Sequence, residues 1–293
     1  MRFVKDYMRD ETLRHELNTL TRNTFGFDFE DWVLNGYFQG DYIPYSYEEN
    51  GEMLSNVSAN IMTFEQEGRT WNFIQIGTVM TAQEHRKKGL ASELVKKIFE
   101  DYKENCDGIY LFANLEALGF YEKQGFEIRK ETRYILKRDV ELFDGKTDEA
   151  FCLMDNEDDT WKQQYLDYLK NATACGAFEQ VNRYGLTMFY TAGFEDVYYS
   201  KKLDCFVVIE QDGDTKHLQS IISKKKVTME DVLKKLDLQG LKLQLGFVPD
   251  KENAHLFDQE QYDGADDYRL YCIGEGLACI EDAKLYFPEF SHA

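Results

Sequence analysis

The clearest signal along the chain is a change in the spacing of apolar residues near residue 80. From Trp71 to Val79, apolar and polar residues alternate, which is typical of a β-strand. From Leu90 to Phe99, apolar residues instead recur every three or four positions, which is typical of an amphipathic helix. A basic turn that contains Gly89 separates the two segments. The pattern therefore predicts a strand, a glycine-containing turn and a helix in direct succession.

The start of that helix is a suitable place to bind an anion. The first backbone N–H groups of a helix have no partner within it, and they lie at the positive end of its dipole. Gly89 would let the backbone approach a phosphate closely, and Arg86, Lys87 and Lys88 add positive charge. The alternative is that these residues form a solvated basic face, which is common at helix starts.

Two sequence motifs follow one another at this point. Arg86-x-x-Gly89-x-Ala91 resembles the acyl-CoA pyrophosphate loop of the GNAT (Gcn5-related) N-acetyltransferases, whose pattern is Gln/Arg-x-x-Gly-x-Gly/Ala. An apolar run at 109–112 predicts a short buried strand. The segment from 114 to 127 is similar to the family's second motif, in which an Asn opens a helix that ends in Tyr-Glu-Lys-x-Gly-Phe. The resemblance covers about residues 1–138.

The resemblance implies direct transfer of an acetyl group from acetyl-CoA, the co-substrate, to an amine. It implies that the strand before the loop offers backbone groups to the pantetheine arm at Val79, Met80 and Thr81. It also assigns the CoA pyrophosphate to the loop and helix start, at Arg86, Lys87, Lys88, Gly89, Leu90, Ala91 and Ser92. Asn114 is expected to contact the CoA arm, and Tyr121 is expected to protonate the leaving thiolate.

One feature of many family members is missing from this chain. Those members carry a Glu on the strand before the loop, where it acts as general base through water. This strand has Asn72 and Gln75 instead, and no acid occurs before Glu84 in the loop. The base could be Glu48, Glu49 or the C-terminal carboxylate, or the amine could lose its proton to solvent. The alternative function is therefore a catalytically silent acyl-CoA-binding or regulatory protein.

An aromatic-rich stretch precedes the predicted sheet. Its rings either pack in the core or line a substrate channel; they are Phe25, Phe27, Phe29, Trp32, Tyr37, Phe38, Tyr42, Tyr45 and Tyr47. Acidic neighbours would suit a cationic acceptor; they are Glu30, Asp31, Asp41, Glu48 and Glu49. On the strand predicted from 52 to 64, Asn56, Ser58 and Asn60 share one face, which looks either to solvent or to the acceptor.

The second half of the chain repeats the order of secondary-structure elements found in the first half, but not its sequence motifs. A hairpin at 205–222, a helix at 228–236 and a strand at 241–248 follow the order of the first half, which has a hairpin at 53–80, a helix at 89–104 and a strand at 109–112. This suggests a degenerate second copy of the same fold. Its turn has Lys224, Lys225 and Lys226 but no glycine, so we expect no CoA there. Further helices are predicted at 161–169 and 178–189.

These patterns together predict an α/β (α+β) fold with two domains. The first, residues 1–140, is a GNAT-like mixed and mostly antiparallel sheet flanked by helices. The second, residues 149–293, is a C-terminal α/β domain. The boundary is placed near 139–148, where the sequence is polar and rich in turn residues. A length of 293 residues agrees with two ordinary domains.

Composition narrows the expected partners and location. A net charge of −20 argues against nucleic acid and is compatible with a cationic small-molecule amine. No apolar run approaches the roughly 20 residues that span a bilayer, and the start lacks the apolar core of a signal peptide. The six cysteines form no Cys-x-x-Cys pair, which indicates thiols in a reducing cytoplasm rather than a disulfide or metal framework. A homo-oligomer is compatible with the sequence.

Overall fold

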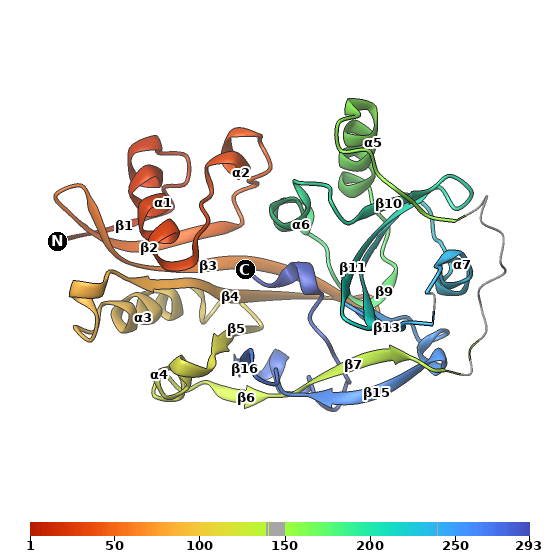
Figure 1. Ribbon diagram of the computed structural model, residues 1–293. Helices are drawn as coiled ribbons and strands as arrows, with labels where there is room; N and C mark the ends of the chain where they lie inside the picture. Colours follow the sequence, from red (N-terminus) through yellow and green to blue (C-terminus); the bar gives the residue numbers. More distant parts are fainter. Residues whose placement is uncertain (139, 141–149, 239) are drawn as a thin grey trace.

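The computed structural model describes residues 1–138, 140, 150–238 and 240–293. The predicted domain boundary at 139–148 lies outside these residues, except for residue 140, and it stays a prediction. The described strands form two sheets (Figure 1). None of the described helices has the length and apolar character needed to cross a membrane.

The first sheet contains most strands of the N-terminal half. Its order is β1 (Arg2–Lys5), β2 (Tyr42–Glu49), β3 (Glu52–Gln66), β4 (Arg69–Thr81), β5 (Gly108–Asn114), β16 (Tyr268–Ile273) and β6 (Glu127–Arg129). On the far end of β3, β9 (Gly176–Gln180) adds a further strand, which also pairs with β14 (Val248–Pro249). The predicted strand–turn–helix segment is confirmed as β4 followed by α3 (Leu90–Tyr102).

The strands of the second sheet correspond position by position to those of the first, from β8 (Cys152–Leu153) in the place of β1 to β15 (Phe257–Tyr262) in the place of β6. The second sheet runs β8, β10 (Val197–Ser200), β11 (Cys205–Asp212), β12 (Thr215–Ile222), β13 (Lys242–Leu245), β7 (Glu131–Leu136) and β15. Each sheet has one parallel pair along this order, β4–β5 in the first and β12–β13 in the second. This correspondence supports the interpretation of the second half as a degenerate copy.

The two sheets exchange one strand each. β7 follows β6 in the sequence but pairs with β13 and β15 of the second sheet. Reciprocally, β16 follows β15 but pairs with β5 and β6 of the first sheet. Each sheet therefore contains a strand from the other half of the chain at the equivalent place.

The helices cover the sheets and bury apolar side chains against them. They are α1 (Glu11–Phe25), α2 (Glu30–Leu34), α3, α4 (Leu118–Glu122), α5 (Asp159–Lys170), α6 (Tyr184–Thr191) and α7 (Met229–Lys235). Asp10 caps α1 by accepting a hydrogen bond from the Leu13 N–H at 3.1 Å. In α3, Leu94, Val95 and Ile98 are fully buried, which contributes about 1.5–3 kcal/mol each. α1 and α3 lie on opposite faces of the first sheet (Figure 1).

The helix predicted at 178–189 is wrong in its first part. Residues 176–180 form β9, which pairs with the end of β3, and the Phe178 ring stacks on Phe64 at 4.5 Å. The helix, α6, begins only at Tyr184. Pairing with a distant strand has overridden the local apolar spacing, which fits a helix and a short buried strand equally well.

Candidate active site

The two central strands of the first sheet separate near their ends. β4 and β5 pair in parallel only from Phe73 to Gln75 of β4, and residues 76–81 have no partner on the β5 side among the described residues. On the β3 side a bulge interrupts the register between Asn56 and Ser58, and Thr78 has a positive φ of 39°. A bulge bends a strand and redirects its side chains. The sheet therefore opens a gap beside β4.

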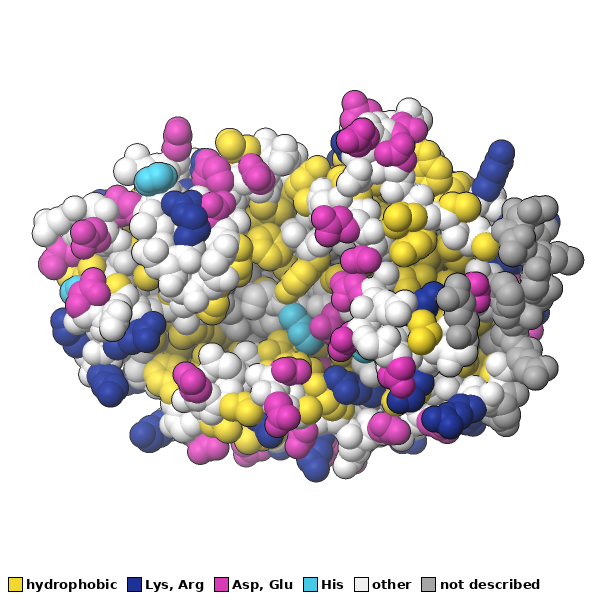
Figure 2. Space-filling view, in the orientation of Figure 1, with side chains coloured by type: hydrophobic (Ala, Val, Ile, Leu, Met, Phe, Trp, Pro, Cys, Tyr) yellow, Lys and Arg dark blue, Asp and Glu magenta, His cyan; other side chains and the backbone are white. Residues whose placement is uncertain are grey.

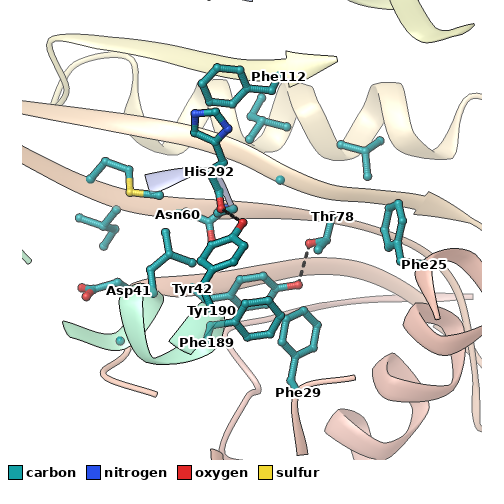
Figure 3. Close-up of a pocket in the computed structure, with 18 of the residues that line it drawn as sticks. Phe25, Phe29, Asp41, Tyr42, Asn60, Thr78, Phe112, Phe189, Tyr190 and His292 are labelled. Carbon is teal, nitrogen blue, oxygen red and sulfur yellow. Dashed lines mark hydrogen bonds between the residues drawn. The ribbon is translucent and has the colours of Figure 1, made fainter. Parts of the chain in front are cut away.

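The last two residues of the sequence lie at the start of this gap. The Ala293 N–H donates to Gln75 Oε1 at 3.0 Å, and a Cβ on Gly77 would lie only 2.6 Å from the Ala293 oxygen. Gly77 is thus required for this close approach. The His292 ring stacks on Phe112 of β5, with ring centroids 3.7 Å apart (Figure 3). The end of the sequence is therefore part of the site.

A cavity of about 680 Å³ adjoins the gap. This volume is in the range of small-molecule binding sites. Figure 2 shows hydrophobic side chains gathered in the hollow between the parts that carry α2 and α6. The aromatic residues that line the cavity are Phe25, Phe27, Phe29, Trp32, Tyr42, Phe112, Phe120, Tyr121, Phe189 and Tyr190.

Tyr121 reaches the cavity from the short helix α4. Its side chain is 5% exposed, and no hydrogen bond among the described residues involves its hydroxyl. Burial raises the pKa of Tyr121, so the phenol stays protonated at neutral pH. Tyr271 of β16 packs 5.8 Å from the Tyr121 ring and donates to Leu118 O and Glu122 Oε1 of α4, each at 3.2 Å. The exchanged strand thus positions the helix that carries Tyr121.

A second cavity lies at the start of α3. Gly89 is the N-cap of this helix, with φ 85°, and a Cβ there would meet nothing within 4 Å. The cavity has a volume of about 570 Å³ and is lined by Thr81, His85, Lys87, Gly89, Leu90, Ala91, Ser92, Lys96, Phe120, Lys123 and Gln124. Ala91 and Phe120 also line the larger cavity, so the two cavities adjoin.

Comparison with known proteins identifies the family of the first half. Residues 14–129 match the family model described as an acetyltransferase (GNAT) domain. The chain therefore contains a GNAT acetyltransferase domain. No curated protein matches the sequence. The family model ends before the second half begins, so it identifies the N-terminal part alone.

Solved structures resemble the chain beyond the GNAT domain. A probable N-acyltransferase from Enterococcus faecalis is 14% identical, with a TM-score of 0.54 over 94% of this chain and 73% of that chain. Eis1 from Mycobacterium abscessus is 15% identical, with a TM-score of 0.54 over 92% and 73%. A GCN5-related N-acetyltransferase from Anabaena variabilis is 13% identical, with a TM-score of 0.55 over 92% and 72%. At these identities the resemblance concerns the fold, and it includes both halves of the chain.

Most site residues predicted in the GNAT domain line one of the two cavities. Val79, Ala91, Asn114 and Tyr121 line the larger cavity. Those that line the cavity at the start of α3 are Thr81, Lys87, Gly89, Leu90, Ala91 and Ser92. Their roles toward CoA stay predictions.

Three of the predicted CoA residues line neither cavity. Met80 is 2% exposed and packs in a core cluster with residues of α1 and α2. Arg86 turns back to donate to Thr81 O at 3.1 Å, and Lys88 is exposed. Only the backbone of these residues, or a side chain that reorients, could therefore contact CoA.

The acidic residues expected near the acceptor are mostly engaged elsewhere. Glu30 accepts hydrogen bonds from Arg14 at 2.9 and 3.0 Å. Glu48 pairs with Arg2, and Glu49 pairs with the N-terminal amine. Among the five acids that the sequence suggested, Asp41 alone lines the larger cavity. The hypothesis that Glu48 or Glu49 is the general base therefore has no support from the geometry.

The polar row of β3 is buried, so the solvent-facing interpretation is wrong. Asn56 and Ser58 are 0% exposed and Asn60 is 4% exposed. The Asn56 amide donates to Thr78 O at 3.0 Å, across the bulge. The Asn60 amide donates to Gln75 O at 3.1 Å, and Asn60 lines the larger cavity. The row therefore holds the bent part of β4 and contributes one polar group to the site.

Sequence reasoning missed the residues that the second half contributes. Phe189 and Tyr190 of α6 and His292 near the end of the sequence line the cavity beside the GNAT domain. Trp32 donates from Nε1 to Gly185 O at 2.7 Å, which joins α2 to α6. The aromatic pair on α6 was the one available signal, but such a pair is equally typical of a helix core.

Proposed function

We propose that the protein is an N-acetyltransferase that moves the acetyl group of acetyl-CoA to the amine of a small molecule. The observation that supports this most is that the two cavities adjoin, with Ala91 and Phe120 in the lining of both. The cavity at the glycine-capped start of α3 suits a phosphate group, and the cavity that contains Tyr121 suits the reacting groups. Ala91 and Phe120 line both, so one extended molecule could occupy them together.

Acetyl-CoA would bind along the start of α3 and the gap beside β4. Backbone N–H groups from 86 to 92 would bind the pyrophosphate, and Lys87, Lys96 and Lys123 supply positive charge around the same cavity. Residues 76–81 have no strand partner on the β5 side among the described residues, so backbone groups that face this side could bind the pantetheine arm. The Thr78 and Thr81 oxygens already accept hydrogen bonds from Asn56 and Arg86, so each would bind the arm through its second lone pair. Asn114, at the end of β5, lies on the opposite side of this gap.

The transfer step forms one bond and breaks another. The neutral amine nitrogen attacks the thioester carbonyl carbon, and the tetrahedral intermediate then loses CoA as a thiolate. Tyr121 is the proton donor to that sulfur, since its phenol is protonated at neutral pH and a thiol has a pKa near 8.5. The products are an N-acetylated amine and free CoA.

We assign His292 as the general base, the group that accepts the proton of the attacking amine. Besides tyrosines, Asp41 and His292 are the ionisable side chains in the described lining of the larger cavity, which also includes the backbone of Ala293, the last residue of the sequence. His292 lies beside the gap between β4 and β5, whereas Asp41 lies before β2 (Figure 3). Burial lowers the pKa of His292, so its imidazole is neutral and can accept a proton. Its Nε2 is buried and has no hydrogen-bond partner among the described residues, so the amine would have to displace a neighbouring side chain to reach it.

A His292→Gln variant tests this assignment through the pH dependence of the rate. We expect kcat/KM of the intact protein to fall on the acidic side, with a midpoint below the ordinary histidine pKa of about 6.5. In His292→Gln this acidic limb disappears and the rate falls. An unchanged profile in the variant would assign the proton to another group, and Asp41→Asn is the matched variant that examines the cavity carboxylate.

The function itself is tested by acetyl-CoA binding and thiol release. Ligand at about 100 times its Kd is expected to stabilise the fold by about 2.7 kcal/mol, which a thermal melt detects. Thiol release that depends on both acetyl-CoA and an amine supports the enzyme. Stabilisation without thiol release from any amine supports the catalytically silent acyl-CoA-binding protein. A melt unmoved by millimolar acetyl-CoA contradicts both functions.

A further inference from the structure

We infer that the acceptor is an arylalkylamine: one amine group on an aromatic body, with no second cation and no carboxylate. This inference rests on the proposed function and names its substrate class. It is drawn from the composition of the larger cavity, in which aromatic rings from two distant segments meet and charged side chains are scarce.

The aromatic wall joins the segment at 25–32 to helix α6. The Phe189 ring lies 5.4 Å from Phe27, 5.9 Å from Phe29 and 5.8 Å from Trp32. Phe29 in turn lies 4.8 Å from Tyr42. These rings are tilted or edge-on to one another, and Figure 3 shows Phe29, Tyr42 and Phe189 grouped together. Aromatic pairs favour such tilted and edge-on geometries, so an aromatic ring of the ligand can join the cluster.

The cavity carries little charge to balance an acceptor. Within its described lining, Asp41 is the single Asp or Glu, and neither Lys nor Arg is present. The lining also carries neutral amides, from Gln39, Asn60, Asn114, Gln180 and Asn182, and the hydroxyl of Thr78. A charge moved from water into an apolar site is costly unless it is paired. One ammonium group could be balanced by Asp41 and the aromatic faces, but a polycation could not.

The same argument excludes an acceptor that carries a carboxylate. An amino acid or a peptide C-terminus would bring a negative charge into a cavity that has no cationic side chain among its described residues. Burial already raises the pKa of Asp41, which shows that the site disfavours even its own carboxylate.

A panel of four amines tests each part of the inference on the intact chain. 2-Phenylethylamine carries the aromatic body and one amine. Phenylalanine adds a carboxylate, spermidine adds charges, and ethylamine removes the ring. We expect kcat/KM, measured as CoA thiol release, to be highest for 2-phenylethylamine. The advantage over ethylamine is expected to be about tenfold to a hundredfold, as expected for burying one phenyl group.

Variants at Phe189 locate the effect in the aromatic wall. Phe189→Ala is expected to lower kcat/KM for 2-phenylethylamine about tenfold, with the acetyl-CoA KM within about twofold of its original value. Phe189→Leu keeps most of the volume and guards against a folding defect. Phe3→Ala is the matched control, since Phe3 lies on β1 and outside the cavity lining.

The outcomes separate this inference from the proposed function. Preference for spermidine, phenylalanine or ethylamine over 2-phenylethylamine overturns the substrate class and leaves the acetyltransferase intact. Bound acetyl-CoA with no thiol release from any amine overturns the proposed function and this inference with it. Preference for 2-phenylethylamine that is equal in Phe189→Ala, Phe189→Leu and the intact chain overturns the assignment of the aromatic wall.

Discussion

Gly89 is the residue on which the proposed CoA site depends most. It begins α3 in a left-handed backbone conformation, with open space where a side chain would point. We expect Gly89→Glu to abolish stabilisation by acetyl-CoA, since a carboxylate would occupy the place of a phosphate and repel it. The measurement is a thermal melt of the variant with and without millimolar acetyl-CoA.

Gly68 provides the matched control for that experiment. It lies in the turn between β3 and β4 with φ 80°, close to the 85° of Gly89, and a Cβ there also meets nothing within 4 Å. Gly68→Glu therefore introduces the same charge and a similar backbone strain of about 1 kcal/mol, away from the loop. Acetyl-CoA should stabilise this variant as it does the original chain. An equal response of Gly68→Glu and Gly89→Glu would contradict the site.

A substitution at Tyr121 is expected to affect the chemical step but not the binding of acetyl-CoA. Its hydroxyl is needed only when the thiolate leaves, so Tyr121→Phe is expected to lower kcat about a hundredfold. The affinity for acetyl-CoA should stay within about twofold, because the ring and its packing are kept. Tyr102→Phe, on α3 and outside the larger cavity, is the control. A Tyr121→Phe enzyme with the original kcat would show that water protonates the leaving group.

Among the elements, β7 begins with a buried acid that links the strand to the end of the chain. Glu131 is 1% exposed and accepts hydrogen bonds from Phe287 N–H at 2.9 Å and from the Tyr268 hydroxyl at 3.1 Å. Burial raises the pKa of Glu131 to about 8. This value exceeds the pKa of about 4.5 that the Glu131 carboxyl has in the unfolded chain. The folded state therefore binds one more proton than the unfolded state between about pH 4.5 and pH 8.

Stability is therefore expected to fall as pH rises through this range. The contribution of Glu131 is complete below about pH 4.5 and is lost by about pH 8. In Glu131→Gln, which stays neutral, the melting temperature should fall less between pH 6 and pH 9 than in the original chain. Thermal melts at both pH values measure this difference. Equal slopes in the two proteins would mean that Glu131 is not buried as an acid; Glu127→Gln, on an exposed edge of β6, is the control.

Local elements could be predicted from the sequence where the signal lies within one segment. The strand and helix on either side of Gly89 have complete apolar periods, and the structure confirms both as β4 and α3. β9 was mistaken for helix because its extended form depends on pairing with β3, more than a hundred residues earlier. Likewise, the ion pairs that engage Glu30 and Glu48 join separate segments. A single sequence carries no signal for such contacts.

At the scale of the whole molecule, the sequence indicated two similar halves but not how they combine. The repeated order of hairpin, helix and strand is confirmed by the matching order of the two sheets. The exchange of β7 and β16 cannot be detected in the sequence of either strand, because each has an ordinary apolar pattern whichever sheet it joins. The exchange also explains how Tyr271 of the second half comes to support Tyr121 of the first.

Because β7 and β16 each pair within the sheet of the other half, we expect the two halves of the chain to fold only together. In a fragment of residues 1–140, β5 and β6 would lose β16 from between them and expose unpaired strand edges, which favour aggregation. We therefore expect 1–140 alone to be unfolded or aggregated. Coexpression of 1–140 with a tagged 150–293 fragment should yield a complex that copurifies and is stabilised by acetyl-CoA.

A shortened second fragment tests whether β16 and the buried segment that follows it are required. Residues 150–262 keep β8, β10, β11, β12, β13 and β15 of the second sheet but lack β16. If β16 and the buried segment after it complete the first sheet, this fragment should not rescue 1–140, although β7 can still pair between β13 and β15. Rescue by 150–262, or a folded 1–140 fragment that binds acetyl-CoA alone, would show that the N-terminal sheet is stable without the exchange. The α3 cavity would then be independent of the second half, whereas the larger cavity would still require α6 and His292.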